Sequence, residues 1–315
     1  MRNKIIEHLL FVNGKIEDLR INTSTLPEDA WKLMDAAFLE GIQERLVFVK
    51  DLKAKGLLEN LGQLGFAKQM YTWQQKIGTG NTTVSIDGNV KADSTNVEFV
   101  SGSIPLPLIS SFVKIGARAL AASVSDGHPL DVTLIREAGK EIASQIELMA
   151  VQGTDFTFGG ASIYGLETAP NRATGTISVS WATATSAQIL ADVFAMTKAL
   201  TDNKFHGDKN LYLPSGYEAM LGKDYGSAYS GTILERILKV PGIASVKILD
   251  KLTAGNVVLV NMQTETVRMI EGAAPSLISA DSNNKMSTEY YGFSIEVLNI
   301  RDNAEGNCGI ANWSE

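Results

Sequence analysis

The stretch from Ser103 to Gly153 constrains the fold more than any other part of the chain. Residues 104–118 predict a strand, and residues 125–129 carry turn residues. A helix is predicted from about Pro129 to Gln152, because Pro suits a first helical turn and Gly suits the position after the last. Its apolar residues recur at spacings of three and four, on one face: Ile135, Ala138, Ile142, Ile146 and Met149. Such a helix is about 35 Å long, so we expect it to be the spine of a domain.

Composition excludes several classes of protein. The 315 residues suffice for one large or two modest domains, and the formal net charge of −7 argues against a general nucleic-acid binder, which needs basic surface. An acidic wall can still enclose nucleic acid. The single cysteine, Cys308, excludes an intrachain disulfide and is interpreted as a half-buried apolar residue. We expect no membrane span and no signal peptide, so the chain is interpreted as intracellular when made.

The residues before the central stretch predict an arm, a helix and a long hairpin. Residues 1–25 predict the arm, and a helix follows the capping pattern of residues 25–28. Residues 46–66 predict a short strand at 46–49 and then a broken helix. Residues 74–103 predict a polar hairpin with strands at 83–87 and 96–100. Because an isolated hairpin is marginal in water, we expect it to need another surface, from its own body or from a neighbouring subunit.

The residues after the central stretch predict a mixture of helices and short strands. A helix is expected with Ile189, Val193, Met196 and Leu200 on one face, and residues 210–214 predict a buried strand. Further elements are expected in this order: a helix capped by Ser215, a loop at 223–231, a helix at 232–238, strands at 246–250, 257–261, 266–270 and 287–300, and a polar tail. The class is therefore α+β.

The sequence holds no pattern typical of catalysis or of cofactor or metal binding. The three histidines, His8, His128 and His206, have no His or Cys partner at metal-ligand spacing, which argues against zinc. No nucleophile elbow, P-loop or dinucleotide fingerprint occurs. We interpret Asp202, Asp208, Asp224 and the basic cluster at residues 50–55 as solvated. By elimination, we expect a structural or binding protein with no cofactor, rather than an enzyme.

The order of these segments resembles a known family. The residues that carry the resemblance are 104–118, 129–153, Gly165-Leu166 and 211–215. Together they are similar to the major capsid protein of tailed bacteriophages, whose fold also builds herpesvirus shell floors and bacterial encapsulin compartments. The segment 26–31 also looks like the start of the N-terminal helix of encapsulins.

The resemblance implies a division of the chain into four parts. Residues 1–72 would form an N-terminal arm and helix, and residues 73–103 an extended loop that reaches over a neighbouring subunit. Residues 104–180 and 285–315 would form a peripheral domain around the spine helix. Residues 181–284 would form an axial domain whose tip lines the five-fold and six-fold holes of a shell.

The resemblance also implies surfaces and partners. Extended-loop contacts between subunits would fall on Val84, Ile86, Lys91, Val97 and Phe99, and the axial loop on Lys223, Asp224, Tyr225 and Tyr229. We predict no cross-link through Lys91, because no partner is evident. The expected partners are other copies, in pentamers and hexamers, together with portal, scaffold or decoration proteins, and DNA would be enclosed without sequence-specific binding.

Three functions stay open at this point. The first is a phage major capsid protein that assembles in the host cytoplasm into an icosahedral virion head around double-stranded DNA. The second is an encapsulin-type shell around a cargo enzyme, and the length of the chain favours the first over it. The third is an α+β enzyme whose site residues are far apart in the sequence.

Overall fold

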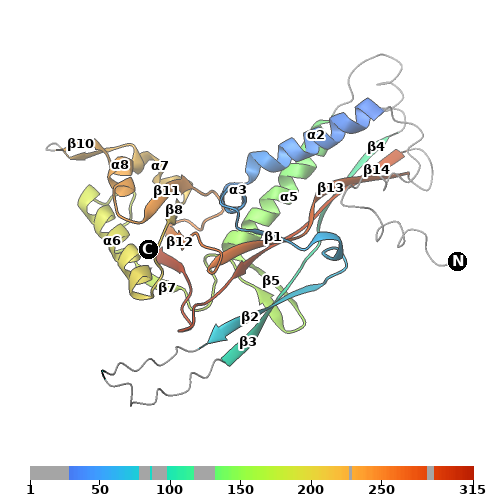
Figure 1. Ribbon diagram of the computed structural model, residues 1–315. Helices are drawn as coiled ribbons and strands as arrows, with labels where there is room; N and C mark the ends of the chain where they lie inside the picture. Colours follow the sequence, from blue (N-terminus) through green and yellow to red (C-terminus); the bar gives the residue numbers. More distant parts are fainter. Residues whose placement is uncertain (1–27, 78–85, 87–97, 117–131, 227–228, 282–286) are drawn as a thin grey trace.

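The computed structural model describes residues 28–77, 86, 98–116, 132–226, 229–281 and 287–315 (Figure 1). Within them, the helices are α2 (Glu28–Arg45), α3 (Phe48–Ala54), α5 (Thr133–Gln152), α6 (Ser186–Asp202), α7 (Glu218–Leu221) and α8 (Ile233–Leu238), with 3₁₀ turns at Gly62–Leu64 and Ser215–Tyr217. The strands are β1 (Leu58–Asn60), β2 (Met70–Ile77), β3 (Glu98–Pro105), β4 (Ile109–Gly116), β5 (Thr154–Phe158), β6 (Ala161–Ile163), β7 (Ala173–Thr176), β8 (Lys209–Leu213), β9 (Asp224–Gly226), β10 (Tyr229–Thr232), β11 (Ile243–Ile248), β12 (Asn256–Asn261), β13 (Val267–Asp281), β14 (Ser287–Ile300) and β15 (Ile310–Ser314).

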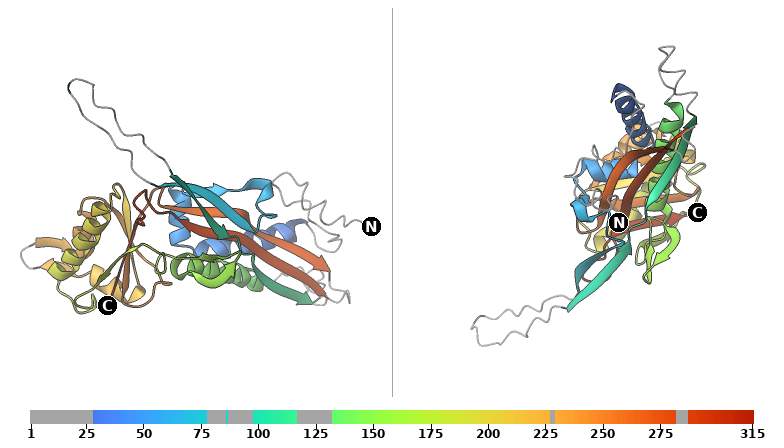
Figure 2. Two further views of the ribbon diagram at one scale, coloured as in Figure 1. Left: turned by 90° about the horizontal axis from the view of Figure 1, so that it is seen from below. Right: turned by 90° about the vertical axis from the view of Figure 1, so that its right-hand side faces the viewer.

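Two mixed sheets form the centres of two bodies. A four-stranded sheet has the order β1-β13-β14-β4, and α2 and α5 cover one of its faces (Figure 1). A five-stranded sheet has the order β11-β8-β12-β15-β7, and α6 packs on it with the short helices α7 and α8 nearby (Figures 1 and 2). The α+β class expected from the sequence is therefore confirmed.

The 20-residue helix α5 occupies the predicted position, with a corrected start. It begins at Thr133, with Val132 at its N-cap, whereas Pro129 lies outside the described residues. It ends at Gly153, whose φ of +81° is left-handed backbone that favours glycine. The preceding strand expected at 104–118 is two strands, because β3 ends at Pro105 and β4 begins only at Ile109. The prolines at 105 and 107 have no N–H to donate to a ladder.

The prediction of a strand at 46–49 is wrong, because these residues lead into the helix α3. Val47 caps the helix without a side-chain hydrogen bond of its own. Instead, the Glu147 carboxylate from α5 accepts hydrogen bonds from the backbone N–H groups of Val47, Phe48 and Val49. These donors have no partner within the helix itself, so a residue about 100 positions away stabilises its start.

Strands on the two sides of the domain boundary expected at residue 285 pair with each other in one sheet. Strand β13 continues past Ile270 to Asp281 and pairs antiparallel with β14, although its residues were expected with the other domain. The register shifts around Ala273, beside Pro275, which suits the bulges to which proline is confined within a sheet. Conversely, the tail expected to be polar contains β15, which pairs with β12 in the five-stranded sheet.

Smaller corrections concern the segment around residue 220. Residues 215–217 form a 3₁₀ turn with Pro214 at its N-cap, and Tyr217 is at the N-cap of α7, so the cap predicted at Ser215 is wrong. The loop expected at 223–231 contains two short antiparallel strands, β9 and β10. The helix expected next is confirmed as α8, and the Thr232 hydroxyl accepts a hydrogen bond from the backbone N–H of Glu235.

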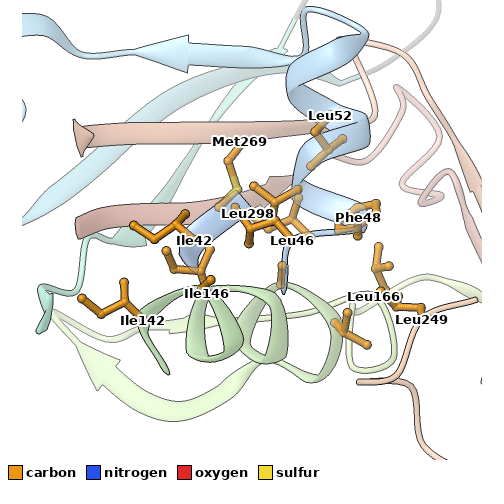
Figure 3. Close-up of a cluster of buried hydrophobic side chains, with 14 of the residues drawn as sticks. Ile42, Leu46, Phe48, Leu52, Ile142, Ile146, Leu166, Leu249, Met269 and Leu298 are labelled. Atoms are coloured by element: carbon orange, nitrogen blue, oxygen red, sulfur yellow. The ribbon is translucent and has the colours of Figure 1, made fainter. Parts of the chain in front are cut away.

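The largest apolar core lies between α2, α3, α5 and the four-stranded sheet. Figure 3 shows side chains from all of these elements meeting there, among them Ile42, Leu46, Phe48, Leu52, Ile142, Ile146, Met269 and Leu298. A second core, which includes Ile189, Val193, Met196 and Leu200, fills the space between α6 and the five-stranded sheet. The largest core also includes Tyr212, Val258, Val260 and Ile310 of the five-stranded sheet, so apolar packing joins the two bodies.

Candidate functional site

An isolated two-stranded ribbon is the feature of the described chain that points most clearly to a partner. Strands β2 and β3 pair over eight residues each, from Met70 opposite Pro105 to Ile77 opposite Glu98, and pair with no other described strand. Figure 2 shows the ribbon leaving the four-stranded body at an angle. A two-stranded ribbon is marginally stable alone, so contacts at its base have to hold it.

Aromatic and charged side chains attach the base of the ribbon to the body. The rings of Tyr71 and Trp73 stack with their centroids 6.0 Å apart, and the Arg301 guanidinium lies 5.8 Å from the Trp73 ring. The Tyr71 hydroxyl donates to the Glu59 carboxylate at 2.7 Å and accepts from Arg301 at 3.2 Å. Gly102, opposite Trp73, leaves the space that the indole occupies.

These contacts have electrostatic consequences. Burial raises the pKa of Glu59, but hydrogen bonds from Tyr71 and Arg268 outweigh burial and hold that pKa below its ordinary value. Burial and the neighbouring Glu59 carboxylate raise the pKa of Tyr71. The base of the ribbon therefore keeps an ionised carboxylate and a protonated phenol, which is the pairing that its hydrogen bonds require.

A cavity of about 370 Å³ lies beside this base. Residues from the ribbon, from the β5–β6 hairpin and from the end of β14 line it, among them Trp73, Gln75, Ser103, Tyr164 and Asp302. The Gln75 amide crosses toward the body and donates to the backbone oxygen of Asp302 at 2.6 Å. The mixed polar and aromatic lining contains no arrangement of nucleophile, base and orienting group.

The predicted extended-loop contacts lie at and beyond the ribbon. Phe99 is 63% exposed on β3, and Ile86 is fully exposed. Val84, Lys91 and Val97 lie outside the described residues. An exposed phenylalanine on a projecting ribbon is an apolar surface available to another chain.

The predicted axial-loop residues lie on and beside the β9–β10 hairpin, at the end of the five-stranded body away from α2 and α5 (Figure 1). Lys223 and Asp224 are exposed. The Arg236 guanidinium of α8 lies 5.4 Å from the Tyr225 ring, which ties the hairpin to that helix. Tyr229 belongs to β10 and pairs with Gly226.

The five residues predicted for the inner face of the long helix are all buried. Ile135, Ala138, Ile142, Ile146 and Met149 are each less than 5% exposed. They pack against α2, α3 and the strands, so this face belongs to the interior of the subunit.

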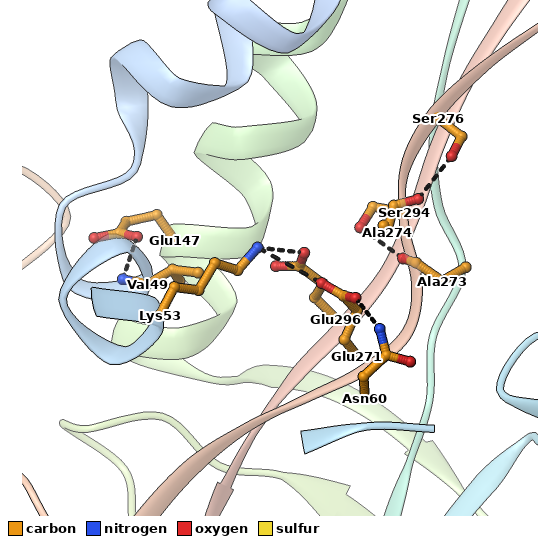
Figure 4. A network of polar contacts seen from close by, with 10 residues as sticks. All are labelled: Val49, Lys53, Asn60, Glu147, Glu271, Ala273, Ala274, Ser276, Ser294 and Glu296. Carbon is orange, nitrogen blue, oxygen red and sulfur yellow. Dashed lines mark hydrogen bonds and ion pairs between the residues drawn. The ribbon is translucent and has the colours of Figure 1, made fainter. Parts of the chain in front are cut away.

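A buried ionic network lies where α3 meets the four-stranded sheet (Figure 4). The Lys53 ammonium is 2.7 Å from the Glu296 carboxylate and 3.9 Å from that of Glu271, and Asn60 donates to Glu271 at 2.6 Å. Glu271 and Glu296 are paired across β13 and β14. Burial raises the pKa of Glu296, and the neighbouring Glu271 raises it further, against the opposing effect of Lys53.

The same short helix also contacts the five-stranded body. Its Asp51 carboxylate accepts a hydrogen bond from the Tyr212 hydroxyl of β8 at 3.0 Å and forms an ion pair with Lys247 of β11. The rings of Phe48 and Tyr212 meet edge to face at 5.3 Å. Helix α3 therefore contacts α5 and both sheets, so it is one of the contacts that join the two bodies.

The described residues contain no cluster suited to a metal, since no three His, Cys, Asp or Glu side chains gather in one place. His206 is exposed, as predicted, while His8 and His128 lie outside the described residues. Cys308 is fully buried rather than half-buried, and burial raises the pKa of its thiol to about 12. No helix in the described ranges has the length and apolar character needed to cross a membrane.

Sequence reasoning missed the residues that anchor the ribbon. The alternation Tyr71-Thr72-Trp73 was a usable signal, because alternate residues of a strand share one face. The partners Glu59 and Arg301 could not be found in this way, since they come from segments 12 and 230 positions from Tyr71.

Solved structures of very different sequence share this fold over most of the chain. A virus-like particle from Pyrococcus furiosus is 13% identical, with a TM-score of 0.66, and the match covers 91% of this chain and 99% of that one. The capsid of Myoviridae phage XM1 is 11% identical, with a TM-score of 0.64 and coverage of 84% and 91%. The capsid of an empty GTA particle is 11% identical, with a TM-score of 0.61 and coverage of 85% and 90%.

These matches establish the fold, which is the one predicted from the order of the segments. In sequence, a family model described as a family of unknown function (DUF6260) matches residues 21–295. A comparison with curated proteins finds no match.

Proposed function

The chain belongs to the family of unknown function DUF6260, and we propose that it is the major capsid protein of a tailed bacteriophage. In this proposal many copies assemble in the host cytoplasm into an icosahedral virion head that encloses double-stranded DNA. The role is structural, and no chemical step is assigned to any residue.

The observation that carries the proposal is the fold. It spans more than four-fifths of the chain and matches subunits whose descriptions name a virus-like particle, a phage capsid and the capsid of a GTA particle. The isolated β2–β3 ribbon supports it, because a projecting ribbon with exposed Phe99 suits contact with another copy. Interfaces of obligate assemblies commonly bury more than about 2,000 Å².

Each body receives a role in this proposal. The four-stranded body with α2 and α5 is the peripheral domain, and the five-stranded body with α6, α7 and α8 is the axial domain. The β9–β10 hairpin, with Lys223, Asp224, Tyr225 and Tyr229, faces the centre of a pentamer or hexamer. Residues 73–103, including Val84, Ile86, Lys91, Val97 and Phe99, reach over the neighbouring subunit.

The partners follow from the same role. The chain binds other copies of itself and meets portal, scaffold or decoration proteins at the shell. Its net charge of −7 suits an inner wall with few strong phosphate contacts, so DNA is enclosed without sequence-specific binding.

Electron microscopy of the purified full-length protein tests the proposal. We expect closed, regular shells tens of nanometres across. A small soluble oligomer at every concentration and ionic strength tried would overturn the assembly role. The third hypothesis, an enzyme whose site residues are far apart in the sequence, would then be favoured.

An encapsulin-type compartment enclosing a cargo enzyme is the second candidate. It is supported by the likeness of residues 26–31 to the start of the N-terminal helix of encapsulins, and the match to a virus-like particle from Pyrococcus furiosus, which covers 99% of that chain, fits a shell of either kind. Shells isolated from the native host separate the two candidates. Nuclease-resistant double-stranded DNA inside them supports the phage head, whereas a single co-purifying enzyme and no DNA supports the compartment.

A further inference from the structure

One face of the four-stranded sheet is only partly covered. Alternate residues of β4 and β14 point to opposite faces. On the helix side, the Ser111 hydroxyl donates to Glu141 of α5 at 3.3 Å, and Gly292 lies against Phe38 and Ile142. On the other side, the base of the ribbon covers the part of β14 near Ile295 and Val297. The other end of that face has no such cover among the described residues.

Large exposed apolar side chains lie on this face, at its uncovered end and beside the ribbon, and we name them the open-face strip: Phe66, Leu108, Phe112 and Tyr291. They are 46%, 55%, 51% and 41% exposed. Phe112 and Tyr291 are directly opposite in the strand register, with ring centroids 4.9 Å apart. Phe66 packs edge to face on Phe293, two residues further along β14.

The strip extends from the part that the ribbon covers to a charged edge. Ser110 pairs with Phe293 and Ile109 with Ser294, so Leu108 lies on the same face at the level of Ile295. Beyond Tyr291, Lys114 and Glu289 form an ion pair at 3.6 Å. An exposed apolar patch with a polar edge is typical of a surface that another segment covers.

Helix α2 covers the opposite face of the sheet and begins toward the same end of the sheet as the Phe112–Tyr291 pair. Phe38 of α2 contacts Gly292, whereas Leu46, two turns later, lies beside Leu298 (Figure 3). Helix α2 therefore runs in the direction in which β14 proceeds, and its start lies toward the end of the sheet where β14 begins (Figure 1). Phe112 and Tyr291 are four residues from that end, which is about 13 Å along a strand.

The residues that precede α2 contain an apolar run on a polar tether. Six of the eight residues from Ile5 to Val12 are apolar: Ile5, Ile6, Leu9, Leu10, Phe11 and Val12. Residues 13–27 separate this run from α2 and are predominantly polar. Fifteen residues span at most about 50 Å, so the apolar run can pass the sheet end and reach the opposite face.

We propose that residues 5–12 of the same chain dock on the open-face strip and form its missing cover. The tether favours this occupant over a separate chain, because a covalent linker of this length makes docking an intramolecular event. Docking would bury both the apolar run and the strip, which would otherwise both contact water. The inference concerns the isolated subunit, so it does not depend on shell assembly.

Thiol labelling tests the proposal, because the chain's one cysteine is buried and has a raised thiol pKa. Phe112→Cys places a single reactive thiol on the strip. It is compared in the full chain and in a chain lacking residues 2–12, in subunits shown by sedimentation to be unassembled. We expect a water-soluble maleimide to label the truncated chain at least about tenfold faster.

Two further variants make the result specific. Ser101→Cys, on the exposed ribbon, should react at the same rate with and without residues 2–12. Leu9→Asp in the full-length chain with Phe112→Cys should reproduce the fast labelling of the truncated chain without any deletion. Equal labelling of Phe112→Cys in the full and truncated subunits would overturn the proposal. So would protection that appears only in assembled particles, since a neighbour would then be the occupant.

Discussion

At the scale of single residues, the buried charges around α3 are the most informative. Lys53, Glu271 and Glu296 bring two carboxylates and one ammonium into a largely buried site. The sequence interpretation treated the basic cluster at 50–55 as solvated, which does not describe Lys53. One cation cannot neutralise two ionised carboxylates, so the site favours a raised pKa for Glu296.

This predicts how stability depends on pH. Because burial and Glu271 raise the pKa of Glu296 in the folded state, the folded chain holds the proton of this carboxyl more tightly than the unfolded chain. Stability should therefore fall as pH rises from the ordinary glutamate value through the raised one. Glu296→Gln removes the titration, so its free energy of unfolding should decline less over that pH range.

Urea unfolding of the subunit at several pH values between 4.5 and 8 measures the effect. Glu40→Gln is the matched control, since the Glu40 side chain is 64% exposed and forms a surface ion pair with Arg136. Parallel pH profiles for the native chain and Glu296→Gln would show that Glu296 does not hold the proton.

At the scale of elements, α5 and its neighbours form the rigid part of the subunit. Gly41 of α2 and Gly139 of α5 each lie against the backbone of the other helix, which allows a close crossing. Two ion pairs, Arg136–Glu40 at 2.8 Å and Lys140–Glu44 at 3.0 Å, link the exposed edges of the same helices. Packing, rather than these surface pairs, is expected to dominate the stability of this unit.

A charge on the buried face of α5 should therefore destabilise the subunit. Ile142 is 1% exposed, so Ile142→Asp buries a carboxylate without a partner and removes apolar packing. We expect a loss of at least about 4 kcal/mol, which places it among the most damaging single substitutions.

Leu134→Asp provides a control on the same helix, since Leu134 is 58% exposed. It should change the free energy of unfolding by roughly 0.5 kcal/mol or less. Thermal and urea unfolding of both variants measure these two changes in the free energy of unfolding. Equal, small effects of the two substitutions would contradict the packing of this face against the core.

At the scale of the whole molecule, the ribbon and the two bodies have separable roles. The strands of the ribbon, β2 and β3, belong to neither of the two large sheets. The ribbon contacts the four-stranded body through its base, for example where Tyr71 donates to Glu59. Shortening it should thus leave the subunit folded while removing contacts that the proposed shell needs.

The specific variant replaces residues 78–97 by Asn-Gly, which closes Ile77 to Glu98 with a two-residue hairpin turn. Unfolding of the isolated subunit should change by no more than about 1 kcal/mol, because the deleted residues are predominantly polar. Electron microscopy should show few or no stable shells. Normal shells from this variant, alongside normal shells from the native chain, would rule out the assembly role of the ribbon.

The sequence by itself determined the elements whose signals are local. The spacing of Ile189, Val193, Met196 and Leu200 predicted α6, and the long helix ends at Gly153 as predicted. The last long strand was predicted at 287–300, as observed in β14. The order of these elements was also sufficient to predict the fold, because layout persists where sequence identity is as low as 11–13%.

The tertiary structure alone decided the features that depend on distant partners. Residues 46–49, which lead into α3, were predicted as a strand because Leu46-Val-Phe-Val has strand propensity. The acceptor for the first N–H groups of α3 is Glu147, which comes from α5. Strand β13 runs through Gly272 and Pro275 because β14 pairs with it on both sides of a bulge. Local propensity cannot report such contacts, since their free energy comes from residues that only folding brings together.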